Sequence, residues 1–164
     1  MPMTPQDIIN VVRDFFDENE LNYDFEESHQ PSPLLRTSMR IHGKLKSIDA
    51  VVDFHDTFFV VYGFCPISAD TDNIAEIAKY IAMANYGLVV GNFELDVRDG
   101  EIRYKTFVDC DGLESISSDI VQRALTMPFH MFDRYGDGIA AIAMGFSDAA
   151  TEYEKAENRQ DDEE

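Results

Sequence analysis

The chain has 164 residues, of which 45% are hydrophobic and 12% aromatic, and its formal net charge is −19 at pH 7. This length and composition predict a single globular domain with a substantial core. So large a negative charge repels phosphate backbones and anionic membrane surfaces. We therefore expect neither nucleic acid nor a membrane among its partners. The charge leaves one exception open, a protein that imitates the acidic surface of DNA.

Two cysteines, Cys65 and Cys110, are too few for a disulfide framework. The first residues, MPMTPQD, lack the basic start and apolar core of a signal peptide. The apolar runs are all shorter than the roughly 20 residues of a bilayer-spanning helix. We expect a cytoplasmic protein with free thiols.

A first helix is predicted from Thr4 to about Asn19. Thr4 is a favourable N-cap, Pro5 suits the first helical position, and apolar residues then recur at helical spacing. A short strand is predicted over residues 22–26, and a loop with two prolines follows it.

Three strands come next, over residues 35–41, 45–54 and 57–64. A turn at His55-Asp56 is predicted between the second and third strands. One face of this hairpin carries a regular set of apolar residues and is expected to face the core. The opposite face is more apolar than a solvated face should be, and it includes Val51, Phe58, Val60, Tyr62 and Phe64. It is therefore expected to be covered by a helix, by a second copy of the chain or by a partner.

A second helix is predicted to begin at Asp70 or Thr71 and to end at Asn85, with Gly87 as its stop signal. Asp99-Gly100 predicts a two-residue turn between strands 88–97 and 101–110. This turn pairs Val97 with Ile102 and Glu94 with Lys105. Apolar pairs then occupy one face and opposite charges the other, as cross-strand pairing favours.

The last predicted helix begins near Ser117 and carries a broad apolar stripe to Ile142. Pro128 lacks a backbone donor, so a bend or break is predicted there. The chain is polar from Glu152 onward, which predicts a solvated tail. We expect one domain over residues 1–148 and a polar acidic tail over residues 149–164.

Short turns between consecutive strands predict an antiparallel sheet and an α+β fold. The sheet has five predicted strands, with the short N-terminal strand as a sixth candidate, and three helices flank it.

One stretch, Ala75 to Thr106, carries a recognisable pattern. A helix ends in Asn85, and a strand, a glycine turn and a second strand follow, with Gly91, Phe93, Leu95, Asp96, Gly100 and Tyr104 at the matching positions. This pattern resembles the YbjN family of small bacterial proteins, and a looser similarity covers about residues 35–146. The resemblance implies a fold like that of type III secretion chaperones, which are small, acidic, usually dimeric proteins that bind other polypeptides. Family members are also described as candidate regulators of sensory transduction.

The residues at the matching positions determine the fold, and they include no group of reactive side chains. Candidate catalytic or metal-binding residues would therefore have to lie elsewhere in the chain. Asp109, Asp111 and Gly112 resemble part of a calcium loop, but the twelfth position of that loop is Ile120, which cannot bind calcium. Neither cysteine has a basic neighbour that would lower its pKa.

Several histidines and aspartates could also carry chemistry. His42 and His55 end two strands that could be neighbours, and Asp53 and Asp56 flank His55, although no typical metal-site spacing supports a metal pair. Asp49 and Asp53 share a strand face and could form a carboxylate pair. We nevertheless expect no catalytic residue, no cofactor and no metal.

The sequence favours a non-enzymatic, chaperone-like or regulatory module that forms a homodimer and docks a client polypeptide. A client strand could add to a free sheet edge, or an apolar segment could cover the aromatic face. The alternative is a metal-dependent sensor or enzyme that uses scattered carboxylates and His55. A DNA mimic is a third, weaker hypothesis. The candidate surface for a partner or a dimer consists of Val51, Phe58, Val60, Tyr62 and Phe64.

Overall fold

The structure, a computed structural model, describes residues 1–162. Its six strands form one antiparallel sheet in the order β1-β2-β3-β4-β6-β5. The strands are β1 (Asp24–Glu26), β2 (Leu34–Arg40), β3 (Ser47–Phe54), β4 (Phe58–Phe64), β5 (Asn92–Leu95) and β6 (Ile102–Asp109). The helices are α1 (Pro5–Glu18), α2 (Ile74–Asn85), α3 (Ser118–Ala143) and α4 (Ala149–Asp162). The predicted α+β class is confirmed, with the short N-terminal strand as the sixth strand and one helix more than expected.

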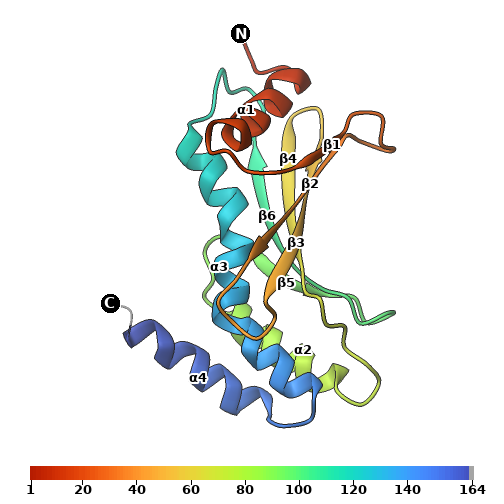
Figure 1. Ribbon diagram of the computed structural model, residues 1–164, viewed down its shortest axis with the longest axis vertical. Coiled ribbons are helices and arrows are strands. Elements are labelled where there is room, and N and C mark those ends of the chain that lie inside the picture. Colours follow the sequence, from red (N-terminus) through yellow and green to blue (C-terminus); the bar gives the residue numbers. More distant parts are fainter. Residues whose placement is uncertain (163–164) are drawn as a thin grey trace.

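The helices lie on one side of the sheet (Figure 1). The long helix α3 packs along β4 and β6, α1 contacts β3 and α3, and α2 packs beside β5. The fourth helix, α4, packs on α2 and α3. The core is filled from one face of the sheet. Within residues 1–162, no helix covers the other face, and none of the helices combines the length and apolar character that a bilayer span requires.

The turn between β3 and β4 differs from the prediction by one position. The His55 N–H donates a hydrogen bond to the Phe58 carbonyl (2.9 Å), so the turn residues are Asp56 and Thr57. Phe54 therefore pairs with Phe59 instead of Thr57. This displaces the register by two residues, which keeps every side chain on its predicted face.

The β5–β6 hairpin is also shifted by two residues from the predicted register. Glu94 pairs with Arg103 instead of Lys105, and Leu95 takes the place opposite Ile102. Residues 88–91 precede β5 without joining the ladder, so the strand is shorter than predicted.

The loop of this hairpin explains the shift. Asp96 and Glu101 close the loop through a backbone hydrogen bond of 2.9 Å. Gly100 has a positive φ of 82°, but Asp99 does not, whereas the predicted two-residue turn needs a positive φ at both positions. The loop is therefore longer, and Val97 is 72% exposed instead of paired.

Helix α3 runs through Pro128 without a break, so of the two predicted outcomes, a bend or a break, the break is wrong. Proline cannot donate to the carbonyl of Ala124, four residues earlier. The buried hydroxyl of Thr106 in β6 donates to that carbonyl at 2.8 Å instead. Pro128 also packs directly on β4, because a Cβ added to Gly63 would lie 2.7 Å from the Cβ of Pro128.

Residues 149–162 form helix α4 instead of the predicted solvated tail. Ala149 and Ala156, one heptad apart, are buried against the domain. The Ala149 N–H donates to the Glu76 carboxylate in α2 (2.7 Å), which gives the start of α4 a hydrogen-bond acceptor. Residues 163 and 164 of the predicted tail lie outside the described residues.

Candidate functional site

The uncovered face of the sheet has an apolar centre on β4. The register sets Tyr62 between Val51 and Lys105, and Val60 between Asp53 and Phe107. All five residues predicted for this surface lie on the uncovered face, and Phe107 from β6 joins them. We call this set the aromatic patch: Val51, Phe58, Val60, Tyr62, Phe64 and Phe107.

Phe107 is the most exposed member of the aromatic patch. Its exposed fraction is 57%, whereas Val60 beside it is 7% exposed although no helix covers it. The Phe58 and Phe107 rings lie 5.2 Å apart and the Tyr62 and Phe64 rings 6.3 Å apart. The aromatic rings therefore shield one another, and Phe107 is the ring of the patch that is most accessible to a partner.

Cationic or titratable side chains stack on two rings of the patch. The Arg103 guanidinium carbon lies 4.3 Å from the centre of the Tyr62 ring, within range of a cation–π interaction. The His55 ring stacks on Phe58 at 4.3 Å with an interplanar angle of 15°. Both ends of the patch thus combine an aromatic surface with a polar group.

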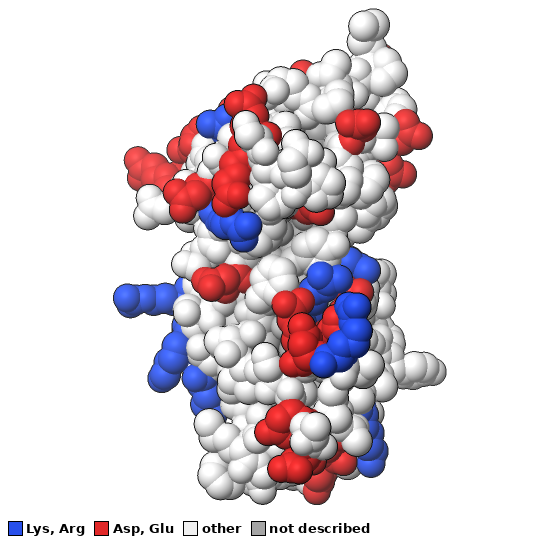
Figure 2. All heavy atoms as spheres, turned by 90° about the vertical axis from the view of Figure 1, so that its right-hand side faces the viewer, with Lys and Arg blue, Asp and Glu red and all other residues white. Residues whose placement is uncertain are grey.

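Charges of both signs surround the aromatic patch, and Figure 2 shows Lys and Arg interspersed with Asp and Glu on this side of the molecule. Arg103 and Lys105 both pair with Glu94, at 2.9 and 3.2 Å. Farther along the sheet, Arg36 pairs with Glu26 at 2.7 Å. This balance contrasts with the net charge of −19 for the whole chain.

The candidate metal-site histidines lie at opposite ends of β3. His42 precedes the strand and lies 3.3 Å from the Asp133 carboxylate of α3, whereas His55 follows the strand and lies 3.2 Å from Asp53. Among residues 1–162, no group of three or more His, Cys, Asp or Glu side chains is arranged to hold a metal ion. The structure therefore does not bring the two histidines together.

The other residues that the sequence offered as candidates for chemistry lie in a turn, on the sheet face or in buried positions. The Asp109 carboxylate accepts a hydrogen bond from the Asp111 N–H (3.0 Å), and this closes a turn. Asp49 and Asp53 both point from β3 to the uncovered face. Burial raises the pKa of the Cys65 thiol to about 11, and burial followed by the nearby Asp109 raises that of Cys110. Thiols with raised pKa values are poor nucleophiles at neutral pH.

A hollow of about 720 Å³ lies between the β2–β3 loop and helices α3 and α4. Asp133 and Asp137 accept hydrogen bonds from the backbone N–H groups of His42 and Lys44, each at 2.6 Å. Burial acts to raise the pKa of Asp137, but its bonds from Lys44 and from Arg159 (3.0 Å) outweigh burial and hold that pKa below its usual value. These charged groups join the loop to the helices.

Comparison with known proteins addresses the fold. No family model and no curated protein matches the chain. A solved structure does match, that of YbjN from E. coli, which is described as a candidate transcription regulator. The TM-score is 0.56 and the identity 9%, over 79% of this chain and 92% of that chain. The fold is YbjN-like. The sequence resemblance is thus confirmed at the level of the fold.

In this YbjN-like fold, the matching residues hold one corner of the sheet together. The Asn85 amide, at the end of α2, donates to the Phe93 carbonyl (2.9 Å) and accepts from the Phe93 N–H (2.7 Å). The Tyr104 hydroxyl donates to the Val90 carbonyl, and its ring meets Phe93 edge to face at 4.9 Å. These residues thus have structural roles at this corner, and the uncovered sheet face remains the candidate functional surface.

Sequence reasoning missed Phe107 as a member of this surface. Its neighbours on the same face of β6 are Arg103 and Lys105, and a large apolar residue after two cations on a solvated face is unusual. This departure from the polar pattern of the strand face is the sequence signal that could have identified Phe107 as part of the surface. The pairing of β6 with β4, which brings Phe107 to the patch, joins strands on either side of α2 in the chain.

Proposed function

We propose that this chain is a non-enzymatic, regulatory protein-binding module that forms a homodimer through the aromatic patch and docks a client polypeptide. The observation that carries the proposal is Phe107, which is 57% exposed and lies beside Val60 on the sheet face that no helix covers within residues 1–162. Aromatic residues are enriched in protein interfaces, and an exposed apolar patch on a sheet is typical of a contact surface.

A second copy is the preferred occupant of the patch because of its charges. A two-fold interface brings the same surface of both subunits together, so it must be self-complementary. The patch is bordered by both Glu94 and the cations Arg103 and Lys105, which allows opposite charges to meet across a two-fold axis. Most other surfaces of so acidic a chain would repel a second copy.

A regulatory role is supported by the structural neighbour, which is described as a candidate transcription regulator. Direct contact with DNA is disfavoured by the charge of −19, because phosphate binding depends on Lys and Arg. Regulation by this chain would therefore pass through contacts with another protein.

Size-exclusion chromatography with light scattering tests the dimer surface. Phe107→Asp places a charge beside Val60 and Phe58 in the patch and should raise the dimer dissociation constant at least about tenfold, or about 1.4 kcal/mol. The matched control is Phe146→Asp, because Phe146 is 81% exposed in the α3–α4 connection, away from the sheet. Equal dissociation constants for the two variants would contradict the proposal, provided circular dichroism shows that both are folded.

A further inference from the structure

We propose that the free edge of β2 binds an extended segment of a partner protein in which basic and apolar side chains alternate. The site consists of the β2 edge from Thr37 to Arg40 and two hollows beside it. It adjoins the aromatic patch only at Val51 and Phe64, which line one of the hollows. The inference deepens the proposed function and rests on it only in taking the partner to be a polypeptide.

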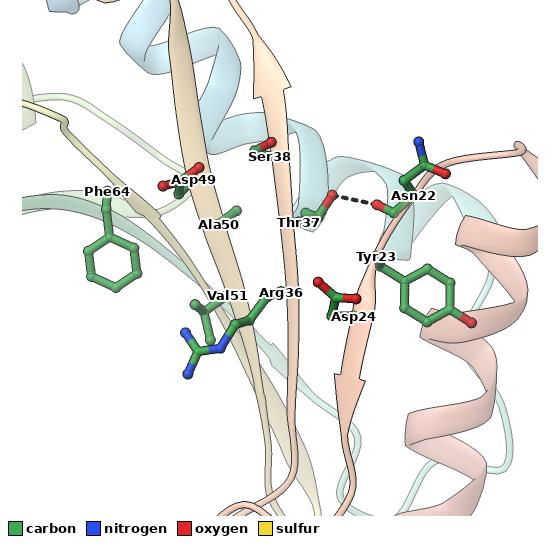
Figure 3. Close-up of a pocket in the computed structure, with 10 residues that line it drawn as sticks. All are labelled: Asn22, Tyr23, Asp24, Arg36, Thr37, Ser38, Asp49, Ala50, Val51 and Phe64. Carbon is green, nitrogen blue, oxygen red and sulfur yellow. Dashed lines mark hydrogen bonds between the residues drawn. The ribbon is translucent and has the colours of Figure 1, made fainter.

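β1 covers only the first half of β2. Its three residues pair with Leu34, Leu35 and Arg36. The chain that precedes Asp24 lies apart from β2, as Figure 3 shows, and within residues 1–162 only the hydrogen bond from the Thr37 hydroxyl to the Asn22 carbonyl (2.9 Å) joins them there. The second half of β2 therefore has no neighbouring strand on this side within the described part of the chain.

The backbone of this second half presents hydrogen-bonding groups outward. The Ile41 N–H donates to the Lys46 carbonyl (2.9 Å), so the backbone groups of Ile41 point to the β3 side. In an antiparallel ladder these directions alternate from residue to residue. The N–H and C=O groups of Ser38 and Arg40 must then point away from β3, to the open edge. Both residues are exposed, and no bond to these groups occurs within residues 1–162.

The opposite edge of the sheet shows what a closed edge looks like in this protein. On β5, the outward N–H and C=O groups of Phe93 are both bonded by the side-chain amide of Asn85. The amide thus occupies the place that a neighbouring strand would take. Because β2 has no such cap beyond Arg36, its second half can accept an added strand.

The surroundings of the edge define the chemistry of that strand. On the helix side, an apolar cavity of about 40 Å³ is lined by side chains that include Phe15, Leu21 and Met39. On the uncovered side, a hollow of about 670 Å³ is lined in part by Asp24, Asp49 and Arg36. Arg36 is already paired with Glu26 (2.7 Å), whereas neither Asp24 nor Asp49 has a salt bridge within residues 1–162. Alternate side chains of an added strand point to opposite faces. Apolar residues would point to the cavity and basic residues to the two carboxylates.

A second copy of this chain is a poorer occupant of the β2 edge. It would bring its own Asp24 and Asp49 to the contact as well as Arg36 and Arg40, whereas a basic segment brings cations alone to the two carboxylates. A basic segment is instead attracted by the negative field of the whole chain. The two surfaces would thus bind different partners, a second copy of the chain at the aromatic patch and a client polypeptide at the β2 edge.

Nuclear magnetic resonance of the ¹⁵N-labelled full chain tests the edge with a defined probe, the end-capped peptide TKVKVT. The amide signals of Ser38 and Arg40 should show the largest shifts, and their hydrogen exchange should slow when the peptide binds. The acidic peptide TEVEVT should bind at least about tenfold more weakly, a difference of about 1.4 kcal/mol.

Two variants of the site and one control variant test the inference further. Asp49→Lys should weaken TKVKVT binding at least about tenfold, whereas Glu154→Lys, with the same charge change at an exposed site on α4, should weaken it far less. Ser38→Pro removes one outward N–H, a change that edge strands tolerate, and should also cost about tenfold.

Three results would overturn the inference: equal binding of both peptides, shifts centred on Phe107, or no shift at about 1 mM TKVKVT. Failure of the edge would leave the dimer mass unchanged, and failure of the dimer would leave peptide binding intact. The two proposals can therefore fail separately.

Discussion

The hydroxyl of Thr106 on β6 donates a 2.8 Å hydrogen bond to the carbonyl of Ala124, which is the helix carbonyl that Pro128 leaves without a donor. One strand residue thus repairs the defect that a proline makes in the neighbouring helix. Thr106 is 2% exposed, so water cannot take over this bond. The contact joins the sheet to α3 and allows the helix to stay continuous.

Thr106→Val should therefore lower the free energy of unfolding by about 1–3 kcal/mol. Valine has nearly the shape of threonine, so the main effect is that the buried Ala124 carbonyl loses its hydrogen-bond donor. Pro128→Ala restores the missing N–H, so Thr106→Val should cost less in that background. Urea unfolding of the four proteins measures the coupling. Thr126→Val is the control, since its hydroxyl bonds a Gln122 carbonyl near the surface (2.8 Å). Additive effects in the cycle would show that the Thr106 bond does not compensate for the proline.

Asn85 should be needed for the stability of the β5 edge. Asn85→Ala removes both hydrogen bonds to the Phe93 backbone and should lower the free energy of unfolding by about 1–3 kcal/mol. The exchange of the Phe93 amide hydrogen should also become faster. Asn10→Ala is a suitable comparison, because Asn10 bonds only Gln6 on the exposed side of α1 (2.9 Å) and its loss should change stability by about 0.5 kcal/mol or less. Unchanged Phe93 exchange in Asn85→Ala would refute the role of this cap.

Alkaline pH should unfold the protein through its buried tyrosines. Burial raises the pKa of Tyr104 to about 12, and it raises the pKa values of Tyr80 and Tyr135 as well. Tyrosine in an unfolded chain ionises near about pH 10, so unfolding releases protons above that pH. The stability from these groups is complete below about pH 10 and is lost as pH rises through about 12. Urea unfolding as a function of pH should show this fall, and a constant midpoint up to about pH 12 would contradict it.

Local rules predicted the parts of the fold that depend on local chemistry. The Thr4 cap is present with its capping box to Asp7, and α2 ends at Asn85 before Gly87, which has a positive φ of 88°. The faces of both hairpins were also predictable, because an error of two residues in register keeps a side chain on its face. The registers themselves were not, since moving a turn by one position or lengthening its loop by two residues preserves the same alternation.

The remaining errors have long-range causes. The continuity of α3 at Pro128 depends on Thr106, which precedes the helix in a separate strand. Helix α4 has a polar sequence and is held by burial of Ala149 and Ala156 against other helices, and tertiary packing commonly supplies most of the stability of such a helix. The aromatic patch was predicted except for Phe107, whose place depends on the pairing of β4 with β6 across the intervening α2.

The central claim is that the uncovered sheet face joins two copies of this chain, and the mass of the unmodified protein in solution tests it most directly. Sedimentation equilibrium over a range of micromolar concentrations should give about twice the chain mass of 18.6 kDa, with dissociation on dilution. A mass of 18.6 kDa at every concentration would contradict the account.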